Sequence, residues 1–167
     1  SELPDGVSHN RVPAWMAPGA DPGLLARMRP DMLLVPSLAS DAAQALPTDD
    51  KGTARCAHII EVGYTSDLHH TDKAEAKALQ HQSLADLLAG HGWNVHYAPS
   101  GIITLGATGS LCTTLWGSLH DIGVGGADAD NLMAKLHKHS VDTAVALIKQ
   151  RRQLERKPRD QIGRAHV

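Results

Sequence analysis

The segment Ile59-Ile60-Glu61-Val62-Gly63 holds a single carboxylate within a run of apolar residues. A continuous apolar run of this kind is typical of a buried strand, and we predict a strand over residues 57–62. An unpaired charge in apolar surroundings is costly. This context therefore favours a functional role for Glu61 over that of a surface acid on an edge strand.

A second buried strand is predicted directly after another acidic residue. Met32-Leu33-Leu34-Val35 is an apolar run that Pro36 stops, and Arg29-Pro30-Asp31 precedes it. The two strands are expected to pair as a hairpin or to lie as neighbours, which brings Asp31 and Glu61 to adjacent strand ends. Two carboxylates and one backbone carbonyl are enough to hold Mg²⁺, which prefers oxygen ligands and keeps several waters. The alternative is that Asp31 only caps the turn after the proline.

The rest of the chain shows helical and extended patterns in turn. Apolar residues recur at helical spacing over 71–89, with Thr71 as N-cap and Gly90 as terminator. We predict strands over 93–98 and 102–105, a short helix over 111–119, and a long final helix that opens at Asp128 and closes with basic residues. Residues 1–28 contain four prolines and are expected to be an irregular N-terminal segment, with at most a short helix over 24–28.

The composition is that of one globular domain. The chain has 167 residues, of which 42% are hydrophobic and 20% charged, so wholesale disorder and two full-sized domains are both disfavoured. No apolar run approaches the roughly 18 to 20 residues that cross a bilayer, and no basic segment followed by an apolar one opens the sequence. We therefore expect neither a membrane protein nor a secreted one. Cys56 and Cys112 lack the spacing of a disulfide framework or a zinc site and are expected to be reduced core residues.

Charge is divided unevenly along the chain. Residues 1–148 carry 9 basic and 16 acidic side chains, a balance of −7, whereas residues 149–160 carry 6 basic and 2 acidic ones, a balance of +4. A basic end on an acidic body suggests contact with a polyanion, and a solvated helix end is the simpler alternative.

The eleven histidines raise the question of a metal site. The densest pairs, His69/His70 and His137/His139, have spacings that do not share a helix face, so surface or capping roles are expected for the histidines. A phosphate-binding loop is disfavoured because Gly101–Gly106 lacks the lysine that should follow it. A serine hydrolase is disfavoured because the motif Gly-x-Ser-x-Gly is absent.

Through Pro30-Asp31 and Glu61, followed by a helix with two lysines and two further strands, the chain resembles the PD-(D/E)xK or restriction-endonuclease-like nucleases. Gly92-Trp93-Asn94-Val95, Ile103-Thr104-Leu105-Gly106 and Ser8-His9-Asn10-Arg11-Val12 look like segments of the nuclease-like domain downstream of the reverse transcriptase in some non-LTR retrotransposons. Residues 8–152 fit, with 13–28 and 36–56 fitting poorly. The resemblance implies an α/β (α+β) fold, with a restriction-endonuclease-like mixed central sheet flanked by helices.

The resemblance also implies a metal site. Asp31, Glu61 and the carbonyl of Val62 would bind Mg²⁺ (or Mn²⁺). Asp67 is a weaker candidate, as a further ligand or as a cap where the next helix begins.

One residue of the family pattern is missing. The family places a lysine two residues after the glutamate, and this chain has Gly63 there. In several branches of the family the next helix supplies this lysine, and Lys73, Lys77 and Gln80 share one face of the predicted helix. Lys77 or Lys73 would then orient and activate the attacking water, and Gln80 would contact the metal-bound water or the scissile phosphate. The alternative is that the two lysines are only the solvated face of this helix.

The function implied is that of a Mg²⁺-dependent endonuclease domain of a mobile element, which nicks target DNA. The expected partners are DNA, the element RNA and the reverse transcriptase domain of the same polyprotein, in the nucleus or elsewhere inside a host cell. The alternatives are a non-catalytic nucleic-acid-docking domain that lost the motif lysine, a Holliday-junction-resolvase-like enzyme and a protein-interaction module. The residues expected to contact nucleic acid are Arg29, Lys149, Arg151 and Arg152.

The expected boundaries are a nuclease-like domain over residues 29–152 and a basic tail over 153–161. The last six residues, 162–167, read Ile-Gly-Arg-Ala-His-Val. This is the translation of ATC GGA AGA GCA CAC GTC, a nucleotide string that resembles a sequencing adapter. We interpret these residues as adapter read-through, and we expect the native protein to extend beyond both ends.

Overall fold

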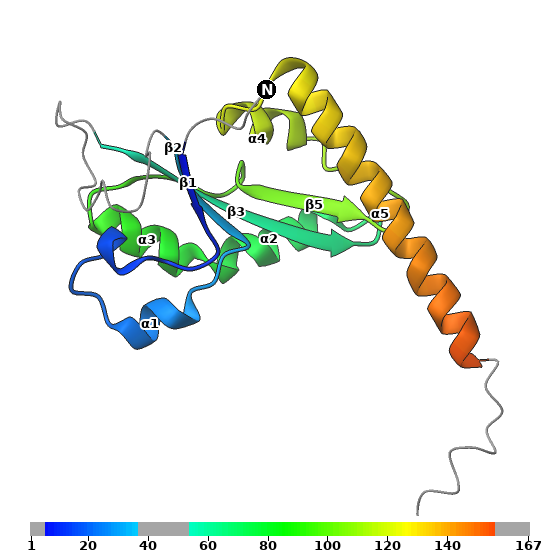
Figure 1. Ribbon diagram of the computed structural model, residues 1–167, viewed down its shortest axis with the longest axis horizontal. Coiled ribbons are helices and arrows are strands. Elements are labelled where there is room, and N and C mark those ends of the chain that lie inside the picture. Colours follow the sequence, from blue (N-terminus) through cyan, green and yellow to red (C-terminus); the bar gives the residue numbers. More distant parts are fainter. Residues whose placement is uncertain (1–5, 37–53, 156–167) are drawn as a thin grey trace, which may run out of the picture.

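A computed structural model of the chain describes residues 6–36 and 54–155, and it has a mixed β-sheet with helices on both faces (Figure 1). The central strand, β3, is also the longest. The prediction of an α+β protein with a mixed sheet flanked by helices is confirmed. The five strands are β1 (Gly6–His9), β2 (Met32–Pro36), β3 (Cys56–Thr65), β4 (Asn94–His96) and β5 (Ile102–Gly106).

The sheet joins an antiparallel half to a parallel half at β3. β1 pairs with β2, and β2 with β3, in antiparallel register, with Met32 opposite Ile60. β4 runs parallel to the beginning of β3 and β5 runs parallel to residues 61–65, so the two short strands follow one another along the other edge of β3. Extending the β2–β3 register by one residue places Asp31 opposite Glu61.

One face of the sheet is covered by η1 (Ala14–Met16), α1 (Pro22–Arg27), α2 (His70–Gln80) and α3 (Gln82–Gly90). Side chains of a strand alternate between the two faces of a sheet, so every second residue of β2 and β3 enters this layer. The core of this layer includes Leu33, Val35, Ala57, Ile59, Leu84 and Leu88.

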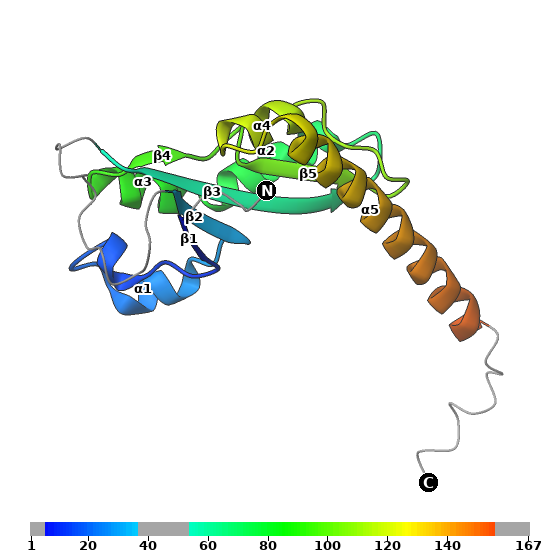
Figure 2. The same ribbon diagram turned by 45° about the horizontal axis from the view of Figure 1, so that its top comes forward.

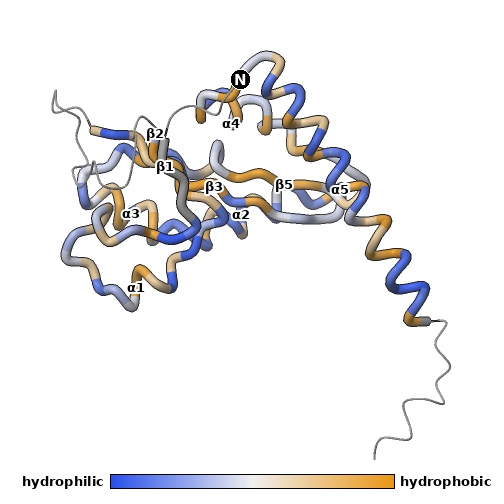
Figure 3. Tube along the Cα trace, viewed as in Figure 1, coloured by the Kyte–Doolittle hydropathy of each residue, from blue (hydrophilic) through white to orange (hydrophobic). Residues whose placement is uncertain are grey.

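The opposite face is covered by α4 (Leu115–Asp121) and the first half of α5 (Gly126–Glu155). β3 and β5 are largely hydrophobic in Figure 3, as expected of strands that are buried on both faces. α5 then continues beyond the sheet (Figure 2). Its side chains from residue 145 to 154 are exposed. The core of this layer includes Ile60, Ile103, Leu105, Leu115, Leu119 and Ala129.

The single helix predicted over 71–89 is wrong, because two helices meet at His81. The backbone of His81 has φ −118° and ψ 17°, outside the helical range, and the residue is 6% exposed. The break lets α2 follow β5 and the later part of β3 while α3 follows β4. The N-cap of α2 is His69, not Thr71.

The N-terminal segment is not the irregular segment that its prolines suggested. Its strand β1 extends the sheet, and Val12 and Met16 are core residues. The strand went unrecognised because backbone pairing with β2, rather than an apolar pattern, places it in the sheet. The extended run predicted over 93–98 is shorter, as β4, and the helix predicted over 111–119 begins only at Leu115.

Two predictions fall outside the described residues. These are the part of the basic tail beyond residue 155 and the adapter-like segment 162–167. Among the helices that the structure does describe, none combines the length and the apolar character needed to cross a membrane.

Candidate functional site

The start of β2 and the middle of β3 bring the two predicted carboxylates together. The Asp31 N–H donates to Glu61 Oε1 at 3.0 Å, and the Val62 N–H donates to Asp31 Oδ2 at 2.7 Å. Each acid therefore accepts from the backbone of the other strand. The Glu61 side chain is 1% exposed and the Asp31 side chain 50% exposed, so the site has one buried and one solvent-facing carboxylate.

Two side chains from the helix layer pair with the Glu61 carboxylate. Lys77 Nζ lies 2.7 Å from Glu61 Oε2, and His81 Nε2 lies 3.1 Å from Glu61 Oε1. Because a carboxylate oxygen only accepts, the proton in the second contact belongs to His81 Nε2. Lys77 Nζ also lies 3.8 Å from Asp31 Oδ2, so its ammonium group bridges the two carboxylates. This pairing allows Glu61 to be buried.

Two lysine side chains of α2 lie over Gly63, the position at which the sequence resemblance leads one to expect a lysine. A Cβ atom at Gly63 would lie 3.0 Å from Lys73 Cε and 3.7 Å from Lys77 Cε. Residues two apart on a strand share a face, so both lysine chains lie over the same face of β3 as Glu61. In the part of the chain that the structure describes, the Lys73 ammonium has no ion pair. Lys77 therefore lies beside the carboxylates and Lys73 over Gly63, and both side chains are partly buried.

Tyr97 holds α2 over the site. Its hydroxyl donates to the backbone carbonyl of Lys77, and its side chain is 6% exposed. Burial raises the pKa of the Tyr97 phenol, and the negative charge of Glu61 adds to the rise. The phenol therefore stays neutral and keeps its hydrogen bond. Tyr97 was not predicted, because it follows β4 and is distant from the motif in the sequence.

The oxygen atoms of the site fit the ligand preferences of Mg²⁺. Among the described residues, Asp31 Oδ1 has no hydrogen-bond partner, and Glu61 Oε2 accepts only from Lys77. The N–H and C=O of one strand residue face the same edge, so the Val62 carbonyl faces Asp31 as its N–H does. Two carboxylates and a backbone carbonyl are the donor set that the sequence predicted.

Several predicted residues do not join this cluster. The Gln80 amide lies 3.1 Å from His81 Nε2. The buried residue that follows Lys73 and Lys77 on their face is His81 and not Gln80. Arg29 is exposed, and its Nε donates to the Ala26 carbonyl at 3.1 Å. Three others lie on exposed turns of α5, which extends away from the sheet: Lys149, Arg151 and Arg152.

Asp67 joins a loop network, not the carboxylate site. Its carboxylate accepts from Ser110 Oγ at 2.6 Å and from Thr108 Oγ1 at 2.8 Å. These hydrogen bonds lower the pKa of Asp67. His70 extends the network, with ring nitrogens 2.8 Å from Ser110 Oγ and 2.7 Å from Thr104 Oγ1. Neither role predicted for Asp67, metal ligand or helix cap, is seen.

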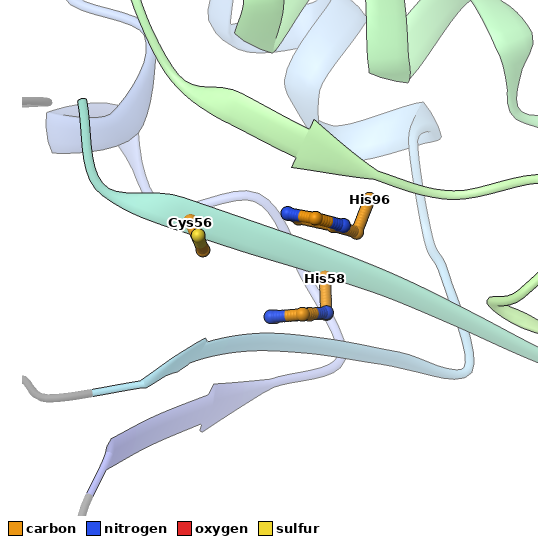
Figure 4. A group of neighbouring side chains, drawn as sticks. All are labelled: Cys56, His58 and His96. Carbon is orange, nitrogen blue, oxygen red and sulfur yellow. The ribbon is translucent and has the colours of Figure 1, made fainter. Parts of the chain in front are cut away.

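A second polar cluster lies on the opposite face of β3. Cys56 and His58 of β3 and His96 of β4 each bring one ligand atom within 4.8 Å of the others (Figure 4). His58 and His81 are buried, so the expectation of surface or capping histidines is wrong for both. Cys56 is a free thiol, as predicted, but it is half-buried and not part of the core. The missed signal is Cys56-x-His58, because residues two apart share a face on a strand although not on a helix.

Comparisons of the chain with protein-family models, with curated proteins and with solved structures found no match. The functional interpretation therefore rests on the geometry of the side chains. That geometry contains two carboxylates, a lysine and a histidine, brought together from three separate parts of the chain.

Proposed function

We propose that the chain is a Mg²⁺-dependent DNA endonuclease domain of the restriction-endonuclease-like kind, which nicks DNA for a mobile element by hydrolysing a phosphodiester. The observation that carries the proposal is the convergence of Asp31, which directly precedes β2, with Glu61 of β3 and Lys77 of α2. A mixed sheet flanked by helices is the architecture that the resemblance implies. Element RNA and a reverse transcriptase domain of the same polyprotein are the further partners we propose.

The residues of the site divide the chemistry among them. Asp31, Glu61 and the Val62 carbonyl would hold Mg²⁺, which when bound lowers the pKa of a water and stabilises charge on the phosphate. Lys77 orients the attacking water through an N–H that Glu61 does not use. Lys73, which lies over Gly63, stabilises the negative charge that develops on the phosphate in the transition state.

Contact with the DNA backbone is supported by basic residues near Asp31. Arg11 and Arg29 line one cavity of about 220 Å³, together with apolar residues of α1, and both are exposed. Arginine binds phosphate through several donors in one plane. This cavity adjoins the segment that leads into Asp31, so a backbone held there is close to the site.

The test is nicking of supercoiled plasmid by the full chain in the presence of Mg²⁺. Asp31→Asn and Lys77→Gln should each slow nicking by about 100-fold or more, the size expected when one charged group of an electrostatic site is removed. Asp86→Asn and Lys138→Gln are matched controls on exposed helix positions and should leave nicking unchanged. Equal rates for the site variants and their controls would refute the proposal.

A rescue experiment tests whether α2 supplies the motif lysine. In a Lys73→Ala, Lys77→Gln background, the space over position 63 is vacated. Gly63→Lys in this background should restore part of the lost nicking, because it returns a lysine to the strand face of Glu61. Gly63→Gln in the same background is the control and should restore none.

The second candidate is a docking domain that binds nucleic acid without cleaving it. It is favoured by the position of the Lys77 ammonium, which already compensates both carboxylates without a metal ion. Such a domain would show no Mg²⁺-dependent nicking. It would bind DNA with a log–log salt slope of about −0.9 for each phosphate that it neutralises.

A further inference from the structure

Cys56, His58 and His96 form a group of metal-ligating side chains apart from the carboxylate site. The Cys56 sulfur and one ring nitrogen of each histidine all lie within 4.8 Å of one another. Figure 4 shows the two imidazole rings side by side, with Cys56 near one end of them. No residue of this group belongs to the proposed nuclease site.

Regular features of the sheet bring the three side chains together. Cys56 and His58 are two residues apart on β3 and therefore share a face. The parallel register places His96 of β4 beside His58, and the two rings stack with centroids 4.7 Å apart and planes 17° apart. The group is therefore held by paired strands and not by a loop.

The imidazole of His58 is buried without a hydrogen bond. It is 5% exposed, and neither ring nitrogen has a hydrogen-bond partner among the side chains that the structure describes, those of residues 10–36 and 54–154. A buried polar group without a partner destabilises a fold. A metal ion bound to one of these nitrogens would remove that cost.

Asp121 at the end of α4 supplies negative charge near His58 on this face of the sheet. Negative charge beside a group of ligands favours a bound cation.

We propose that Cys56, His58 and His96 bind Zn²⁺, with water as the fourth ligand. Thiolate and imidazole are ligands that zinc prefers, whereas magnesium takes oxygen ligands. Bonds of about 2.0 to 2.3 Å place the ligand atoms of a tetrahedral site roughly 3.3 to 3.8 Å apart. Side-chain shifts of about 1 Å, together with rotation of the imidazole rings out of their stacked arrangement, bring the group from its present spacing to that of a zinc site. The bound ion joins the three-residue strand β4 to the central strand.

The first test is titration of the full chain with Co²⁺ under reducing conditions, followed by displacement with Zn²⁺. One equivalent should bind and produce a thiolate-to-cobalt charge-transfer band that Zn²⁺ abolishes. Cys56→Ser should remove the band and weaken Zn²⁺ binding by at least about tenfold, the smallest loss typical when a metal site is disturbed. Cys112→Ser, at the other free thiol, should change neither. The absence of saturable binding, or loss of the band with Cys112→Ser, would overturn the proposal.

A second test needs no variant. Alkylation of the unmodified chain, read by peptide mass spectrometry, should slow at Cys56 when Zn²⁺ is added and stay constant at Cys112. Equal slowing at the two thiols would show non-specific binding and refute the site. Neither test measures nicking, so failure here leaves the proposed nuclease site standing, and loss of nicking in Asp31→Asn does not depend on this cluster.

Discussion

The two faces of β3 carry clusters of different design. On the α2 face, Glu61 is buried with a full set of partners: a backbone N–H, Lys77 and His81. On the α4 face, His58 is buried without a hydrogen bond within the described residues, next to Cys56 and His96. Groups of the protein itself pair with the buried carboxylate of the first cluster. In the second cluster, a bound ion would supply the partner that the buried His58 lacks. The partners of a buried polar group, and not its burial alone, therefore indicate its role.

The difference between the clusters also concerns chemistry. The α2 face offers oxygen atoms, which suit a hard cation such as Mg²⁺, and the α4 face offers sulfur and nitrogen, which suit Zn²⁺. One strand thus presents two distinct ligand sets because its side chains alternate between the faces. Changes on one face should leave binding at the other intact.

The largest effect is expected from removing the buried carboxylate of Glu61 on the α2 face of β3. Glu61→Ala leaves Lys77 and His81 without their partner, and breaking a buried ion pair in this way costs about 3 to 5 kcal/mol of unfolding free energy. Urea denaturation measures the loss. Asp86→Ala, on the exposed side of α3, should stay within about 0.5 kcal/mol. A similarly small loss for Glu61→Ala would mean that the ion pairs hardly contribute.

Zinc should stabilise the folded chain through the cluster of Cys56, His58 and His96. At free Zn²⁺ of about 100 times its Kd, the unfolding free energy of the unmodified chain should rise by about 2.7 kcal/mol, because the ion binds the folded state. The increase should vanish in Cys56→Ser and persist in Glu61→Gln, whose change lies on the other face of β3. Persistence of the full increase in Cys56→Ser would place the ion elsewhere.

A smaller effect is expected from the contact that holds α2 over Glu61. Tyr97→Phe removes the hydroxyl that donates to the Lys77 carbonyl and should cost about 1 kcal/mol in urea denaturation. It should also slow nicking, since Lys77 would be held less firmly. Tyr64→Phe is the matched control, because Tyr64 of β3 is 48% exposed. Equal effects of the two changes would show that the Tyr97 hydroxyl does not hold Lys77 at the site.

The smallest effect concerns a carboxylate that belongs to neither cluster. Hydrogen bonds from Ser110 and Thr108 lower the pKa of Asp67 below its ordinary 3.8, so its ionised form stabilises the folded state above that pH, and this contribution is lost as the pH falls through the lowered pKa. The stability difference between the unmodified chain and Asp67→Asn should therefore be larger at about pH 7 than at about pH 3. Urea midpoints at both values measure it. A difference that grows in acid would contradict the assignment.

Prediction from the sequence succeeded where the signal was local. The apolar runs around Leu33 and Ile59 predicted β2 and β3, and a carboxylate inside an apolar run singled out Glu61. The break at His81 was missed because residues 71–89 have a continuous helical pattern, and the contact that favours the break lies on β3, far away in the sequence. The histidine spacing was misjudged because it was evaluated for helices, whereas Cys56 and His58 lie on a strand.

By itself, the sequence predicted the buried strands β2 and β3 and singled out Asp31 and Glu61 as candidate site residues, since apolar runs and isolated charges are visible without a fold. The tertiary structure alone decided that Asp31 lies opposite Glu61, that the α2 lysines occupy the space over Gly63, and that His96 stacks on His58. These outcomes depend on strand register and on the choice of face. Both are fixed by pairing and burial between segments that are distant in the chain, which no local pattern records.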